Sequence, residues 1–466
     1  MKRRVWLGLA LVGCVTPFAG VTAQDSRVVP PTSEVKPPSV KAEPATKPQV
    51  KQEGGALTVE PTPATTSDGV LVEEPSLSDR LGGFREALFR PWSFSWFDEF
   101  TGANNQLMTS DVEDPYWFRM ELLFARFKDA NTPPLLTTSL PQSSQGILGN
   151  EGTRVLFGGS IDLETHLGFK VVGGMWLQPA QTWGFEASYF NVFNKSHQFR
   201  MQSQGDPLLA NPYFDSLTNT ESSYIIAREA GAGVNQISGN VLLGTHSRLQ
   251  GFTFNNVHNI TRGTNGRLDW SWGYRFLYLD EALYNEFFQE EAPVTGNGIG
   301  VQRLIYDDFG TSNTFNGINF GMRSQWYKGC WTFDVSGQLG FGFNRNTVQI
   351  NGTTLSASPP NFQILTRSGG IYALDSNGGQ ETEIGFMFVP EIELGVGYFF
   401  CEYGRIYLNY NFMAMTGVVR PGDQVDRRIN PNILDGNSGN PATPENFHNH
   451  STFWMQTLAI GFELRY

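Results

Sequence analysis

The last ten residues of the chain, TLAIGFELRY (457–466), alternate between apolar positions and small or polar positions. The apolar parity consists of Leu458, Ile460, Phe462, Leu464 and Tyr466. A period of two residues predicts a β-strand whose two faces differ chemically. A soluble sheet would place the apolar face on a core, whereas a membrane barrel would place it against lipid.

The same alternation recurs along the rest of the chain and predicts ten strands. These lie at about 116–127, 165–177, 182–200, 246–260, 267–279, 314–328, 330–344, 384–399, 404–416 and 453–466. Four of the connections are short, at 178–181, 261–266, 328–329 and 401–404. Five are long, at 128–164, 201–245, 280–313, 345–383 and 417–452. This alternation is typical of an outer-membrane barrel with tight periplasmic turns and long external loops.

We therefore predict an all-β chain: a single up-and-down antiparallel transmembrane β-barrel of about ten strands at 116–466. Twelve strands are the alternative, because the long connection at 201–245 has room for two more. A soluble β-sandwich is the competing fold. It is disfavoured because loops of this length are uncommon inside compact domains.

Aromatic residues make up 13% of the chain, and several stand beside the predicted short turns. Such clusters indicate an aromatic girdle at the periplasmic membrane surface, formed here by Trp183, Trp326, Trp331 and Tyr398. The alternating final strand with its terminal aromatic resembles the signal that barrel-insertion machinery reads in bacterial outer membranes. We predict this machinery and outer-membrane lipid as partners.

The N-terminal region predicts export. Lys2, Arg3 and Arg4 precede an apolar run at 5–15 and a small-residue cleavage site before Gln24, so residues 1–23 read as a signal peptide. The run is too short for a transmembrane helix. An alternative is lipid attachment at Cys14, and either reading exports the protein.

Two further segments precede the barrel. Residues 24–75 contain nine prolines and no aromatic residue, which predicts a disordered periplasmic arm. The arm is either a passive spacer or a tether toward peptidoglycan. Residues 76–115 combine helically spaced leucines with five aromatics in 91–100, and predict a membrane-surface helix, a plug or an entrance to the barrel.

Charged residues recur on the parity that would face the lumen. They are Arg119, Glu121, Lys170, Glu186, Arg267, Asp269, Arg275, Asp334, Glu391, Glu393, Arg405, Glu463 and Arg465. In a barrel of about ten strands the lumen is narrow. These side chains would either form ion pairs that plug it or line a small aqueous channel. The net charge of −12, without a basic cluster after residue 4, excludes nucleic acid as a partner.

The chain offers little for catalysis. It has six histidines, of which only His448 and His450 form a close pair, in a predicted loop. No zinc-binding His/Cys spacing occurs. We predict no catalytic, cofactor or metal site and no enzyme activity. Cys330 and Cys401 should lie on the same periplasmic rim of neighbouring strands, where a disulfide is predicted.

Several stretches resemble a family of exported bacterial proteins named as β-barrel porins, which are prominent in planctomycete-type genomes. The resemblance is carried by PPLLTTS (133–139), ILGNEGTRVLFGG (147–159), HLGFKVVGGMWL (166–177), TWGFEASYF (182–190), SRLQGFTFN (247–255) and WGYRFLYLDE (272–281). It implies an outer-membrane barrel and, by name, a pore, but no catalytic set.

Two functions follow from these observations. The first is porin-like passage of small solutes across the outer membrane. The alternative is a structural or adhesive surface barrel with a closed lumen and functional extracellular loops.

Overall fold

The computed structural model describes residues 115–231, 233–292 and 300–466. The predicted signal peptide (1–23), the Pro-rich arm (24–75) and all but the last residue of the 76–115 segment lie outside the described residues. Those assignments stay predictions.

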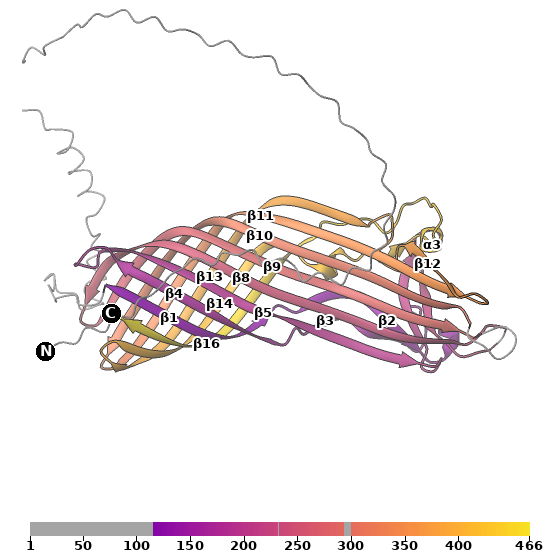
Figure 1. Ribbon diagram of the computed structural model, residues 1–466, viewed down its shortest axis with the longest axis horizontal. Coiled ribbons are helices and arrows are strands. Elements are labelled where there is room, and N and C mark those ends of the chain that lie inside the picture. Colours follow the sequence, from indigo (N-terminus) through magenta and orange to yellow (C-terminus); the bar gives the residue numbers. More distant parts are fainter. Residues whose placement is uncertain (1–114, 232, 293–299) are drawn as a thin grey trace, which may run out of the picture. The chain divides into compact units, whose positions relative to one another are not determined.

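Ten long antiparallel strands form a closed ring (Figure 1). They are β1 (Tyr116–Phe127), β4 (Thr165–Trp176), β5 (Trp183–Ser203), β8 (Ile237–Gly263), β9 (Gly266–Glu291), β10 (Gln302–Lys328), β11 (Trp331–Ser358), β13 (Gly379–Cys401), β14 (Gly404–Val419) and β16 (His450–Arg465). Their order is β10-β9-β8-β5-β4-β1-β16-β14-β13-β11, and pairing of β10 with β11 closes the ring. The predicted ten-stranded up-and-down barrel is confirmed.

The outer surface carries an apolar belt that begins at the short turns. Trp272, Ile318, Phe388 and Ile460 belong to it, and each remains between 43% and 56% exposed. Roughly 12 residues per strand, at about 3.3 Å per residue and a tilt near 45°, give a belt about 28 Å tall. That height matches the hydrocarbon layer, so these segments span a membrane. No helix among the described residues is both long and apolar enough to cross one.

The strands continue well beyond this belt, where large apolar side chains appear on the inner face among buried polar ones. In the part of β9 that lies within the belt, Trp272 points to the outer surface and Arg275 points into the lumen. Farther along the same strand, Leu283 and Phe287 are fully buried inside, while Glu286 is exposed outside. The prediction ended this strand at 279 because it followed apolar residues on one parity only. β9, β10 and β11 instead run for 26, 27 and 28 residues.

A second sheet fills the extracellular end. This loop sheet consists of β2 (Ala130–Ser139), β3 (Thr153–Ile161), β6 (Leu209–Asp215), β7 (Thr220–Ala227) and β15 (Arg428–Ile429). All five come from the long connections. Leu135, Leu136 and Leu209 are fully buried in it and share one apolar cluster with Leu279 and Phe315 of the barrel wall.

Short elements complete the chain: η1 (Gln142–Ser144), η2 (Pro421–Gln424), α3 (Pro431–Leu434) and β12 (Gln363–Ser368), which pairs with β11. Figure 1 shows β2, β3, β12 and α3 toward the end of the barrel opposite the C-terminus. The extra strands that could have made a twelve-stranded ring therefore lie in the loop sheet, and the ring itself has ten.

Candidate functional site

The membrane-spanning half of the lumen is lined by charged side chains. All thirteen predicted lumen charges face it, their side chains are at most 20% exposed, and each takes part in an ion pair. Ion pairing satisfies charges that a narrow lumen removes from bulk water. The arrangement is a network of contacts rather than a set of isolated groups.

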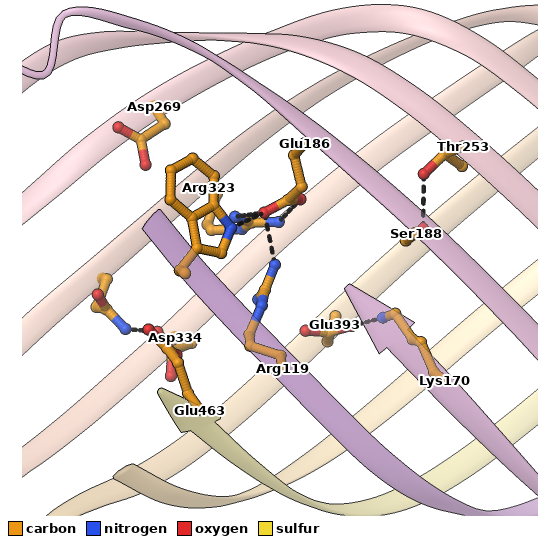
Figure 2. A network of polar contacts seen from close by, with 12 residues as sticks. Arg119, Lys170, Glu186, Ser188, Thr253, Asp269, Arg323, Asp334, Glu393 and Glu463 are labelled. Carbon is orange, nitrogen blue, oxygen red and sulfur yellow. Dashed lines mark hydrogen bonds and ion pairs between the residues drawn. The ribbon is translucent and has the colours of Figure 1, made fainter. Parts of the chain in front are cut away.

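Glu186 on β5 is the centre of one part of this network (Figure 2). Its carboxylate accepts hydrogen bonds from Arg119 of β1 at 2.7 Å and from Arg323 of β10 at 2.7 and 3.0 Å. Trp117 Nε1 donates a further bond at 2.9 Å. Because β8 and β9 separate β5 from β10 in the ring, the contact with Arg323 crosses the lumen.

Other pairs also join strands that are not neighbours. Lys170 of β4 lies 3.0 Å from Glu393 of β13, and Arg275 of β9 is paired with Glu391 of β13. Three strands of the ring separate β4 from β13, and two strands separate β9 from β13. Three cavities between the lumen side chains have volumes of about 20, 20 and 50 Å³. Each has room for only one or a few water molecules.

Arg323 was missing from the predicted lumen residues, although the pattern contained it. In GINFGMRSQW (317–326), Ile318, Phe320 and Met322 alternate outward, so Arg323 falls on the inward parity. Tyr407, whose hydroxyl donates to Glu121 at 3.0 Å, was missed because tyrosine was counted with the apolar face.

Beyond the membrane, the lumen is held closed by a buried carboxylate. Asp307 on β10 faces inward and is fully buried. Its Oδ1 accepts N–H bonds from Ile371 and Ala373, both at 3.0 Å, and its Oδ2 accepts one from Tyr372 at 3.2 Å. The segment 369–378, between β12 and β13, is thereby drawn into the barrel. A side chain at Gly370 would clash with Asp307, since a Cβ there would lie 2.0 Å from Oδ1.

The inserted segment also holds the loop sheet. The hydroxyl of the fully buried Tyr372 donates to the carbonyl of Pro212 in β6 at 3.0 Å. Arg420, just before η2, pairs with Glu281 of β9 at 2.7 Å and donates to the carbonyl of Asp129 at 2.7 Å. These contacts join four separate long connections to one another and to the inner wall of the barrel.

The predicted disulfide is not formed in the structure. Cys330 and Cys401 lie on the same rim of neighbouring strands, as expected, but both are free and exposed. Phe399, not Cys401, stands opposite Cys330 and donates its N–H to the Cys330 carbonyl at 2.8 Å. An offset of two residues separates Cα atoms by about 7–8 Å, more than the roughly 4.4–6.8 Å that a disulfide usually spans.

The four predicted girdle residues lie at the periplasmic ends of β5, β10, β11 and β13. Trp331 and Tyr398 are 52% and 39% exposed, and their rings meet edge to face at 5.2 Å. The apolar residues of the last strand face outward, and β16 pairs with β1 to complete the ring. Recognition of this strand by insertion machinery stays a prediction.

We expect Glu186→Gln to lower the free energy of unfolding by about 3 kcal/mol, because Arg119 and Arg323 would be left without their shared buried carboxylate. Urea unfolding of the detergent-folded barrel measures this. Glu164→Gln is the matched control, since Glu164 is exposed and its ion-pair partners among the described residues, Lys195 and His197, lie at the surface. Equal stability of the two variants would contradict the role given to Glu186.

The stability of the extracellular part should depend on pH through Asp307. Burial raises the pKa of Asp307 from 3.8 to about 6, against the opposing effect of its three N–H donors. The folded chain therefore holds this proton more tightly than the unfolded chain. The free energy of unfolding should rise as the pH falls through 6 toward 4, by about 1 kcal/mol between pH 7 and pH 5.

Urea midpoints at the two pH values, compared between wild type and Asp307→Asn, isolate this contribution. The variant should lose that part of the pH dependence. If wild type and variant respond to pH identically, Asp307 does not titrate as described.

Three solved structures to which the chain is similar, at low sequence identity, are the following. The protease OmpT from Escherichia coli is 9% identical, with 77% of this chain and 100% of that chain covered and a TM-score of 0.34. The toluene transporter TodX from Pseudomonas putida is 9% identical, with 78% and 94% covered and a TM-score of 0.21. A FadL homologue from Pseudomonas aeruginosa is 8% identical, with 78% and 93% covered and a TM-score of 0.19. Likeness at this level says nothing about what this chain does.

No curated protein sequence matches the chain. A family model described as "Putative beta barrel porin-7 (BBP7)" matches residues 117–466, which is the whole barrel together with its long connections. The chain belongs to this family of outer-membrane β-barrel proteins.

Proposed function

We propose that this outer-membrane barrel is closed to solutes at rest and acts through its extracellular end, as a structural or adhesive surface protein. The observation that carries the proposal is the double filling of the lumen. Ion pairs cross its membrane-spanning half, and the loop sheet with segment 369–378 occupies its extracellular half.

The ion pairs make spontaneous opening rare. A passage along the lumen requires the contacts of Glu186 with Arg119 and Arg323 to separate, and the free-energy cost of opening includes the charge-assisted hydrogen bonds of each pair. The apolar packing of the extracellular half adds to it, because the loop sheet would also have to leave the barrel.

The extracellular end presents surface suited to contact. Ile364 and Leu365 on β12 are 68% and 62% exposed, and Leu140 is 80% exposed. A closed barrel can contact other molecules only through exposed connections such as these, and loops carried on a rigid scaffold often supply binding residues in proteins.

Regulated passage of small solutes is the second candidate. It is favoured by the family description and by the polar lining of the membrane-spanning half, where closure depends on ion pairs around water-sized cavities. In this case the filled state would be the closed state of a gated pore.

Single-channel recording in planar bilayers distinguishes the two candidates. We expect the refolded chain from Gln24 onward to produce no conductance steps, with heat-modifiable gel migration confirming that the barrel is folded. Steps in this protein would contradict the closed barrel and support the pore. Steps only after removal of residues 24–115 would also contradict it, because closure would then depend on the N-terminal segment.

A further inference from the structure

We infer that a groove on the outer wall of the extracellular half binds an uncharged saccharide. The groove lies on three neighbouring strands, β5, β8 and β9, and its volume is about 460 Å³. This volume is within the range of roughly 300–1,000 Å³ that is usual for small-ligand sites. The groove is therefore large enough for a ligand, whereas the lumen cavities hold only water-sized groups.

Strand register arranges the outward side chains of the groove in two rows. In the first row, Leu242 of β8 stands between Arg200 of β5 and Glu286 of β9. The second row, two residues away along each strand, consists of Gln202, Asn240 and Phe288. Met201 and Val241 complete the lining, and their side chains pack inward with the apolar cluster of the barrel.

The groove lies beyond the hydrocarbon layer. Counted from the short turn, the apolar belt on β9 ends near Tyr278, and Glu286 is eight residues farther along the strand. At about 3.3 Å per residue and a tilt near 45°, this places Glu286 about 19 Å above the belt. The groove therefore faces water, and a polar, soluble ligand can reach it.

The polar side chains of the groove have few partners within the protein. In the described part of the chain, the side chains of Gln202, Asn240 and Glu286 make no hydrogen bond or ion pair. Arg200 donates to Gln198 Oε1 at 2.9 Å, which fixes its guanidinium group at the edge of the groove. Amide donors and acceptors, a carboxylate acceptor and a guanidinium donor are thus all available to a ligand.

This combination of groups matches a sugar. A hydroxyl group both donates and accepts, so sugar hydroxyls can bond to the amides, the carboxylate and the guanidinium alike. The C–H face of a sugar ring can pack on Leu242 and on the ring of Phe288, whose face is electronegative. Arg200 and Glu286 are the charged residues of the lining, and their charges cancel. The groove therefore favours an uncharged saccharide over an anionic or cationic one.

The backbone under the groove is unsuited to a peptide. β8, the middle strand, pairs with β5 on one side and with β9 on the other. An extended peptide that adds to a sheet needs an open strand edge, which β8 does not offer. Binding in the groove must therefore depend on side chains, as recognition of a sugar does.

The inference rests on the proposed surface role and names a ligand class for it, but the two can fail separately because the groove lies outside the lumen. Conductance steps would contradict the closed barrel whatever the groove binds. Absence of saccharide binding would overturn the inference and leave the closed barrel intact.

A glycan array tests the inference. The refolded chain from Gln24 onward is biotinylated at the exposed Cys330 and Cys401, at the opposite end of the barrel, and assembled on streptavidin so that avidity retains weak binding. We expect binding to a subset of uncharged glycans. A blank array, or binding to anionic glycans alone, would overturn the proposal.

Variants locate the binding site, with the dissociation constant measured for a bound glycan free in solution. Gln202→Ala should weaken binding about fivefold through a lost hydrogen bond, and Phe288→Ala about tenfold through lost ring packing. Gln349→Ala is the matched control, since Gln349 is an exposed amide on β11 outside the groove, and it should bind as wild type does.

Heat-modifiable gel migration shows which variants are folded. If Phe288→Ala does not fold, Phe288→Leu replaces it and should also weaken binding, because it keeps an apolar side chain but loses the ring. If folded Gln202→Ala and the folded Phe288 variant bind the glycan as tightly as Gln349→Ala, the saccharide binds elsewhere and the proposal is overturned.

Discussion

The polarity of the two strand faces governs the whole structure. Within the membrane, the outer face must be apolar and the inner face can carry charge, whereas beyond it water wets the outer face and the inner face must find other partners. The strands of this chain cross that boundary without ending. On β9 the inward residues change from Asp269 and Arg275 to Leu283 and Phe287 along one continuous strand.

The lumen is filled in two ways because the inner face of the strands differs between the membrane-spanning part and the extracellular part. In the lower part, a ring of ten strands brings inward charges so close together that they must pair, and Glu186 with its two arginines is the clearest result. In the upper part, the inward face carries large apolar side chains such as Leu283 and Phe287 beside polar ones such as Asn285, and it must be covered by protein. The loop sheet and segment 369–378 cover it, and Asp307 anchors the latter through three backbone N–H groups.

The sequence predicted the barrel well because lipid imposes a simple alternation on each strand. Ile460 and its neighbours on the last strand, for example, face outward as their parity required. The sequence predicted the extracellular half poorly because there the large apolar side chains lie on the inner face of the barrel and not on the outer face. The stretch SGNVLLGT (238–245), which the prediction placed in the long connection 201–245, is the first part of β8, with Leu243 buried on the inner face.

Contacts between connections that are distant in the sequence could not be predicted from the alternation of apolar and polar residues. Nothing near Asp307 in the sequence indicates that Tyr372 will lie against it, or that Arg420 will meet Glu281, because each contact depends on how two long connections fold together.

The chain's own loops fill the extracellular lumen, and hydrogen exchange of the protein in membranes is the measurement that probes this filling. We expect the amides of Ile371, Tyr372 and Ala373 to exchange as slowly as those of β10 and β11, while the exposed turn around Asn150 exchanges quickly. Fast exchange at 371–373, comparable to that turn, would contradict a filled lumen and leave the barrel open at its extracellular end.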